Sequence, residues 1–182
     1  AKNHMIVVPD ADQDSTAKGL LASSMGSAGQ RCMAASVAVA VADVDPIIDQ
    51  LVEEARNYKP GVDMGTIVSK VALERITGYI DEAEKMGAKI LIDGRNTTPP
   101  EGYEHGYWLG VTILDDVDPN WPSATDEIFG PVLSIIRTDT LENAMKIENE
   151  NQYGNAAAVF TTSGQVAKTI SESASAGMIG IN

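Results

Sequence analysis

The sequence alternates short apolar runs with longer segments of helical periodicity along its whole length. Residues 36–42 read Ser-Val-Ala-Val-Ala-Val-Ala, and a β-branched residue at every second position is typical of a strand that faces a core. Residues 69–86 instead repeat apolar side chains at a helical spacing, as at Ile76 and Ile80, and Gly87 follows as a helix stop. Alternating strands and helices predict the α/β class, with a mostly parallel sheet flanked by helices.

The same patterns define the expected elements. Asp12 suits the positive end of a first helix, Pro46 fits the first turn of a second, and Thr140 is an N-cap for a later one. Residues 93–110 are rich in Gly, Pro and Thr, which predicts a long surface loop or hairpin. No repeat or linker divides residues 1–182, so we expect one domain. We expect strands at 5–8, 36–42, 89–92, 111–114, 132–136, 156–160 and 178–181, and helices at 12–28, 45–57, 69–86, 140–149 and 163–174.

The composition limits the classes of partner. The formal net charge of −13 disfavours nucleic acids and anionic membranes, which both attract basic proteins. No apolar run approaches the ~18 residues that a membrane-spanning helix needs. The single cysteine excludes an intrachain disulfide and favours a reducing compartment, so we expect a cytoplasmic location.

Cys32 lies in a glycine-bordered turn, after the first predicted helix, with Gly29-Gln30-Arg31 directly before it. At a helix N-terminus, the helix dipole and Arg31 would both favour the reactive thiolate. Backbone N–H groups there would also point at a developing oxyanion. The alternative is a buried and inert residue, which is common for free cysteines. The local sequence leaves both interpretations open.

Glu127 is a second candidate, because it precedes Ile128-Phe129 and a Gly-Pro turn that leads into a predicted strand. A carboxylate at the mouth of a strand can bind ribose hydroxyls, as acidic residues do in dinucleotide sites. The alternative is a solvated acid beside a buried Phe129.

The chain has two histidines, His4 and His105. We interpret His105 as a loop residue and His4 as a residue near the terminus, both structural or on the surface. The chain has one cysteine and no pair of histidines at the spacing of metal ligands. These residues do not form the usual ligand set of a zinc site, so we expect no metal.

Four motifs stand in order along the chain: Gly29-Gln30-Arg31-Cys32 and residues 127–132, 153–161 and 177–182. Together they resemble the motifs of the aldehyde dehydrogenase superfamily, and the resemblance covers nearly the whole chain. Each motif alone is weak, whereas the ordered set is specific. Residues 1–5, 9–12 and 29–34 are most similar to the CoA-acylating branch of methylmalonate-semialdehyde and malonate-semialdehyde dehydrogenases. Gly65-Thr66 and Gly110-Val111 depart from the Gly-Pro that the family often has, which affects local loop shape.

The resemblance implies an NAD-dependent oxidoreductase in which the Cys32 thiolate attacks the aldehyde carbon. Loss of a hydride to NAD leaves a thioester on Cys32, which the thiol of CoA displaces, and a malonate-type substrate then loses CO2. The resemblance also implies that Glu127 binds the nicotinamide ribose and that Phe129 packs beside the nicotinamide end.

Arg31 is a candidate ligand for the substrate carboxylate, because a guanidinium group binds a carboxylate bidentately. The alternative for Arg31 is that it faces solvent or a neighbouring helix. The local sequence does not separate these two interpretations.

The resemblance further implies that residues 1–182 are the catalytic domain, without the N-terminal NAD-binding domain and the C-terminal oligomerisation segment. The family's oxyanion-hole Asn also lies upstream. We therefore expect the segment alone to have little or no dehydrogenase activity, and the whole protein to be a homo-oligomer in the cytoplasm, or in the mitochondrial matrix of a eukaryote.

Two rival interpretations remain open. One is a hydrolytic aldehyde dehydrogenase that releases a free acid and does not need CoA. The other is a catalytically inert α/β scaffold or assembly fragment in which Cys32 is buried.

Overall fold

The computed structural model describes residues 1–182 and contains one seven-stranded sheet with the order β3-β4-β5-β2-β1-β6-β7. Every neighbouring pair of strands is parallel except β3 and β4, which are antiparallel. The predicted α/β class with a mostly parallel sheet is therefore confirmed. The strands are β1 (Asn3–Val7), β2 (Ala35–Val41), β3 (Lys89–Ile92), β4 (Thr112–Asp115), β5 (Val132–Thr138), β6 (Ala156–Phe160) and β7 (Met178–Ile181).

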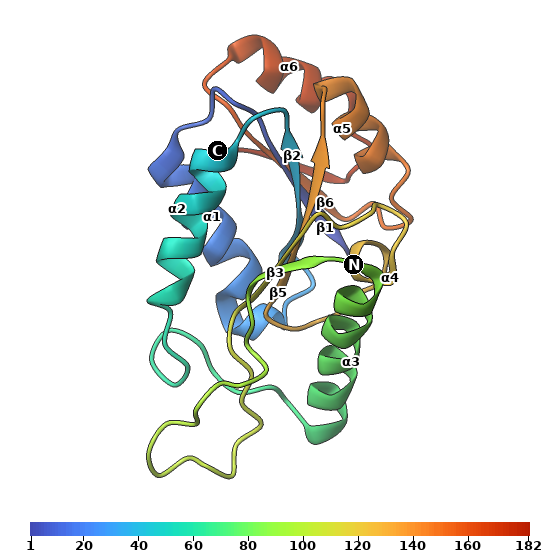
Figure 1. The fold of residues 1–182 in the computed structure, drawn as a ribbon. Helices are drawn as coiled ribbons and strands as arrows, with labels where there is room; N and C mark the ends of the chain where they lie inside the picture. The colour runs from blue at the N-terminus through green and yellow to red at the C-terminus, as the bar shows by residue number, and fades with distance from the viewer.

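Helices cover both faces of the sheet. Figure 1 shows α1 and α2 against one face and α3, α4 and α5 on the other, while α6 connects β6 to β7. None of these helices is long and apolar enough to cross a lipid bilayer. The helices are α1 (Gln13–Met25), α2 (Asp45–Arg56), α3 (Lys70–Met86), α4 (Pro122–Thr125), α5 (Leu141–Asn149) and α6 (Gly164–Ser173), and a 3-10 helix, η1 (Gly26–Gly29), follows α1.

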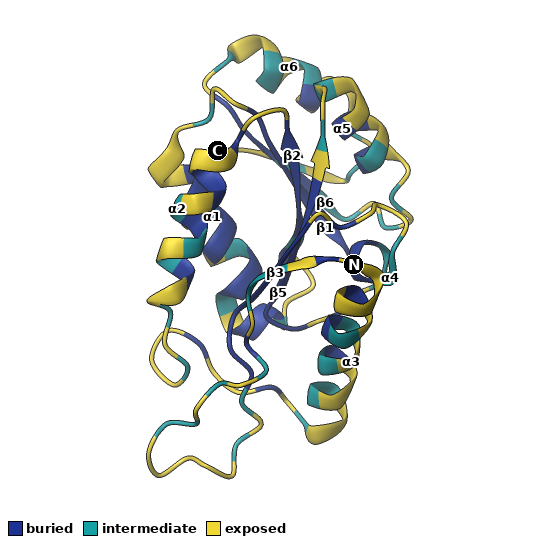
Figure 2. Ribbon diagram, in the orientation of Figure 1, coloured by how far each residue is buried: buried dark blue, intermediate teal, exposed yellow.

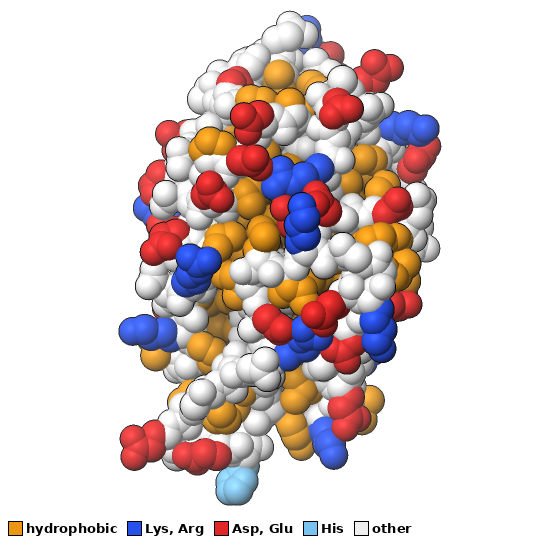
Figure 3. Space-filling model, viewed as in Figure 1, with side chains coloured by type: hydrophobic (Ala, Val, Ile, Leu, Met, Phe, Trp, Pro, Cys, Tyr) orange, Lys and Arg blue, Asp and Glu red, His pale blue; other side chains and the backbone are white.

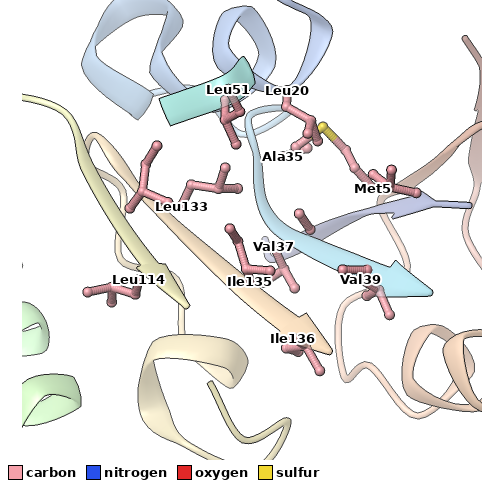
Figure 4. Close-up of a cluster of buried hydrophobic side chains, with 14 of the residues drawn as sticks. Met5, Leu20, Ala35, Val37, Val39, Leu51, Leu114, Leu133, Ile135 and Ile136 are labelled. Carbon is pink, nitrogen blue, oxygen red and sulfur yellow. The ribbon is translucent and has the colours of Figure 1, made fainter. Parts of the chain in front are cut away.

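The core lies on both sides of the central strands, which are dark along their length in Figure 2. Val39 of β2 pairs with Ile136 of β5 on one face of the sheet. Leu133 and Ile135 of β5 lie on the opposite face, which α2 covers with Leu51 (Figure 4). Both faces of a parallel sheet are covered by helices, which explains why β2 is apolar at six of its seven positions and β5 at four of its first five. Each large apolar side chain buried here contributes roughly 1.5–3 kcal/mol.

The predicted element boundaries differ from the observed ones mostly by one or two residues, with two larger differences. The first helix ends at Met25, not at residue 28, because Ser27 and Ala28 have a positive φ of 54° and turn the chain sharply. The short helix α4 was not predicted, although Pro122 at its first turn is a usable signal. Residues 93–110 form the predicted loop, which joins the antiparallel strands β3 and β4.

Charged side chains are distributed over the surface. On the face seen in Figure 3, acidic side chains are spread among basic ones and do not gather in one patch. Arg137 of β5 binds Asp115 of β4 through Nε and Nη2, at 2.9 and 2.8 Å, and Asp45 of α2 through Nη1, at 2.7 Å. This ion network joins two strands to a helix at one end of the sheet.

Polar side chains are buried at the start of β1. His4 Nδ1 lies 2.7 Å from Glu148 Oε2, and both side chains are almost fully enclosed. His4 is therefore a structural residue, as expected. Lys2 is also enclosed, and its Nζ has no hydrogen-bond partner. Burial lowers the pKa of Lys2 to about 7, and the nearby charges of Asp126 and Glu127 oppose this shift only in part.

Lys2→Met should stabilise the fold at neutral pH. The unfolded chain holds the Lys2 proton up to a pH near 10.5, whereas the folded chain releases it near 7. The unfolded state therefore binds more protons between these values, so stability rises with pH across this window and the cost of the buried charge is greatest below it. We expect Lys2→Met to raise the free energy of unfolding at pH 7 by about 1–4 kcal/mol and to flatten its rise above pH 7.

Urea denaturation at pH 7, 8 and 9 measures both effects. Lys85→Met, at an exposed lysine of α3, is the matched control and should change stability by less than about 0.5 kcal/mol. Equal free energies of unfolding for Lys2→Met and the parent protein at pH 7 would show that the buried ammonium group of Lys2 does not destabilise the fold.

Candidate functional site

Four chain segments meet at one edge of the sheet. Strands β5, β2, β1 and β6 are adjacent and parallel, so the residues that precede them lie at the same edge. Residues 32–34 precede β2, residues 129–131 precede β5, Lys2 precedes β1, and Asn155 precedes β6. In open parallel sheets, ligands commonly bind beyond the carboxyl ends of the strands. Here the predicted site residues lie instead at the amino ends.

Cys32 lies in the turn between η1 and β2, and it is exposed. The interpretation as a buried core residue is therefore wrong. The helix dipole considered for Cys32 is also not available, because the element that follows the turn is a strand and no helix begins there. The left-handed conformations of Ser27 and Ala28 end the preceding helix. After the turn at Cys32, the next element is strand β2.

Two side-chain amides hold the Cys32 turn. Asn3 Nδ2 donates to the carbonyl oxygen of Cys32 at 3.0 Å, and Asn155 Nδ2 donates to the same oxygen at 2.9 Å. Neither asparagine was predicted from the sequence to be a site residue. The available signal was position: Asn3 lies two residues before the predicted strand 5–8, and Asn155 lies directly before the predicted strand 156–160.

The loop that carries Cys32 touches the loop that carries Glu127 and Phe129. Gly29 has a φ of +67°, and a Cβ atom at this position would lie 2.1 Å from the carbonyl oxygen of Gly130. Only glycine allows this backbone approach at this conformation. The structure therefore brings together the first two motifs, which are far apart in the sequence.

Gln30 and Phe129 border a common hollow of about 500 Å³. Gln30 Nε2 donates to the Thr66 carbonyl oxygen at 3.0 Å, and its Oε1 accepts from the Val68 N–H at 2.9 Å. The Phe129 ring is 37% exposed, so the alternative in which Phe129 is buried is wrong. The hollow is lined by Ser27, Gln30, Gly65, Thr66, Val68 and Phe129.

The side chain of Glu127 is 42% exposed. Arg75 of α3 donates to the Glu127 backbone oxygen at 3.3 Å. The preceding residue, Asp126, accepts a 3.0 Å hydrogen bond from the hydroxyl of Tyr79, and burial together with this bond raises the pKa of Tyr79. Helix α3 thus anchors the loop while the Glu127 carboxylate stays accessible.

Arg31 points to helix α1. Its Nη2 donates to the carbonyl oxygens of Ala22 and Ser23, at 3.1 and 2.8 Å. These carbonyls belong to the last turn of α1, where helices lack partners for several C=O groups. The two hydrogen bonds favour the interpretation in which Arg31 faces a neighbouring helix over a direct contact with the substrate carboxylate.

A second hollow, of about 640 Å³, lies among β5, α4, α5 and the loop before β6. It is lined mostly by polar residues, including Arg137 and Lys146. Cys32, Glu127 and Phe129 are not among its lining residues, so it is separate from the candidate site. The exposed His105 lies in the loop 93–110, as expected.

Comparisons with known proteins cover the whole chain. The model of the aldehyde dehydrogenase family matches residues 1–182. The mitochondrial acylating methylmalonate-semialdehyde/malonate-semialdehyde dehydrogenase of Bos taurus is 43% identical over 188 residues, a match that covers 100% of this chain and 35% of the relative.

Solved structures agree. The methylmalonate-semialdehyde dehydrogenase of Oceanimonas doudoroffii is 40% identical with a TM-score of 0.95, covering 100% of this chain and 38% of that one. An aldehyde dehydrogenase of Mycobacterium tuberculosis, complexed with NAD+, is 31% identical with a TM-score of 0.91 and the same coverage. The chain thus spans little more than a third of these relatives. Because the family model matches every residue, the chain belongs to the aldehyde dehydrogenase family.

Proposed function

We propose that residues 1–182 are part of the catalytic domain of an NAD-dependent, CoA-acylating methylmalonate- or malonate-semialdehyde dehydrogenase. The observation that carries this proposal is the contact of Gly29 with Gly130, which joins the Cys32 loop to the Glu127–Phe129 loop. The names of the relatives supply the substrate class and the acylating reaction. The chain covers only 35% of the bovine relative, so we propose this activity for the whole protein and not for residues 1–182 alone.

Cys32 is the proposed nucleophile. Its exposed position in a turn allows its thiolate to attack the carbonyl carbon of an aldehyde, which forms a C–S bond while an electron pair of the C=O bond moves onto the oxygen, giving a negatively charged thiohemiacetal. Removal of a hydride from this carbon converts the adduct into a thioester on Cys32. The thiol of CoA then attacks the thioester carbon, and the Cys32 thiolate leaves as acyl-CoA forms.

Glu127 and Phe129 fit the nicotinamide half of NAD. The Glu127 carboxylate is exposed enough to accept hydrogen bonds from ribose hydroxyls, and the exposed Phe129 ring offers an apolar surface at the hollow shared with Gln30. When bound, NAD supplies the acceptor for the hydride. The protein's own residues hold this end of the cofactor near Cys32.

The partners follow from this reaction. A semialdehyde acid and CoA are the small-molecule substrates, and malonate-type substrates lose CO2 to give acetyl-CoA or propionyl-CoA. The whole protein is proposed to be a homo-oligomer, in the cytoplasm or in the mitochondrial matrix. The name of the bovine relative describes that protein as mitochondrial.

Cys32→Ala should abolish turnover. NADH formation by the intact protein is followed at 340 nm with malonate semialdehyde, with and without CoA. We expect CoA-dependent turnover in the parent protein and none above background in Cys32→Ala, because the variant lacks the thiolate that forms the bond to the aldehyde carbon. Turnover that is indifferent to CoA would instead assign the protein to a hydrolytic branch, and turnover that survives in Cys32→Ala would refute the nucleophile.

Glu127→Gln should weaken the binding of NAD. A hydrogen bond to a charged group contributes about 1.5–3 kcal/mol, so the KM for NAD should rise roughly 10-fold to 100-fold while the KM for the semialdehyde changes little. Steady-state kinetics with each substrate varied in turn measures this. Glu101→Gln, in the exposed loop, is the control. Equal KM values for NAD in Glu127→Gln and the parent protein would rule out the ribose contact.

Arg31→Leu separates the two roles considered for this residue. If Arg31 caps α1, kcat/KM falls by the same factor for a semialdehyde acid and for a simple aldehyde, and the melting temperature falls too. The hydrogen bonds to Ala22 and Ser23 make this the expected result. A loss at least tenfold larger for the semialdehyde acid would support the carboxylate contact instead.

A further inference from the structure

The carbonyl oxygen of Cys32 accepts hydrogen bonds from two side chains of distant segments. Asn3 belongs to β1, and Asn155 comes directly before β6. Their Nδ2 atoms lie 3.0 and 2.9 Å from the same oxygen. A carbonyl oxygen has two lone pairs, so these two donors occupy its full capacity.

Asn3 is well placed to hold the turn, because its own position is fixed. Its side chain is buried and also donates to the Ala34 carbonyl oxygen at 2.9 Å. Its Oδ1 accepts from the Ala156 N–H at 3.2 Å, which connects it to β6. Asn3, in β1, thus connects the turn before β2 to the first residue of β6.

Asn155 reaches the turn from the outside. Its Nδ2 donates to the Cys32 carbonyl and also lies 3.1 Å from Met33 Sδ. Unlike Asn3, Asn155 is only partly buried and lies outside the strands. Asn155 can therefore be changed with less risk to the fold than Asn3.

The turn itself supplies little to hold Cys32. Its backbone hydrogen bond runs from the Ala34 N–H to the Arg31 carbonyl oxygen, at 3.0 Å, and the strand pairing begins only at Ala35. The two asparagine amides fix the plane of the peptide that follows Cys32. Fixing this plane restricts the backbone dihedrals of Cys32 and therefore the direction of its Cα–Cβ bond.

We propose that Asn155 and Asn3 form a carboxamide clamp that positions Cys32 for attack. Both are positioning residues, because they touch the backbone of Cys32 and not the reacting atoms. The proposal rests on the proposed function of Cys32 as the nucleophile. The clamp matters for rate because a reacting atom displaced by about 1 Å can lose about 100-fold in activity.

Two variants of Asn155 test the clamp in the intact protein. Asn155→Leu removes both polar atoms, and Asn155→Asp keeps the shape while replacing the donor with an acceptor that repels the Cys32 carbonyl. Gln152→Leu is the matched control, because Gln152 lies in the same loop, is exposed, and donates to the Thr125 carbonyl oxygen, away from the Cys32 turn.

The first readout is amide hydrogen exchange of residues 30–36, followed by mass spectrometry. We expect at least about tenfold faster exchange of the Ala34 amide in both Asn155 variants and no change in Gln152→Leu, because a freed turn opens more often. The second readout is kinetic. We expect kcat to fall about 10-fold to 100-fold in both Asn155 variants while the KM for NAD stays within about twofold.

The outcomes separate this proposal from the proposed function. Parent-like exchange in both Asn155 variants overturns the clamp, and so does faster exchange without a loss of kcat. Equal effects in Gln152→Leu also overturn it, because they would show general loosening of the loop. If the parent protein forms no NADH with any semialdehyde, the proposed function fails, while the exchange of residues 30–36 still decides whether Asn155 holds the turn.

Discussion

The parallel alignment of β5, β2, β1 and β6 is the constraint on which the rest of the structure depends. Adjacent parallel strands place their amino ends at one edge, so strand pairing alone brings the segments that precede them together. Cys32, Phe129, Lys2 and Asn155 all lie in such segments. A strand-order change would separate these residues even if every strand and helix still formed.

This convergence requires the loops to approach one another closely, and the backbone conformations reflect that requirement. Ser27, Ala28 and Phe129 have positive φ values, which non-glycine residues adopt at a cost of about 1–3 kcal/mol each when the surrounding structure holds them there. Gly29 avoids that cost at the point where the chain passes against Gly130. Such costs are acceptable at this edge because the buried strands β2 and β5 supply the stabilisation that offsets them.

Buried polar groups mark the same edge. The enclosed Lys2 and the His4–Glu148 pair lie at or next to the start of β1, where an apolar residue would cost less to bury. Asn3 lies between Lys2 and His4 and has partners for its amide in the Cys32 turn and β6. The contacts of Asn3 therefore explain why a polar residue is buried at the start of β1. The Nζ atom of Lys2, in contrast, has no hydrogen-bond partner among residues 1–182.

The sequence by itself determined the local elements and the candidate residues of this protein. The β-branched repeat of residues 36–42 identified β2, the helical spacing with Gly87 identified α3, and the motifs around Cys32 and Glu127 identified the candidate nucleophile and cofactor carboxylate. Only the tertiary structure decided that Cys32 is exposed before a strand, that Arg31 binds α1, and that Asn3 and Asn155 share one carbonyl oxygen. The reason is physical: periodicity reflects which face of a segment is buried, whereas a hydrogen bond between distant residues depends on where strand pairing places both of them.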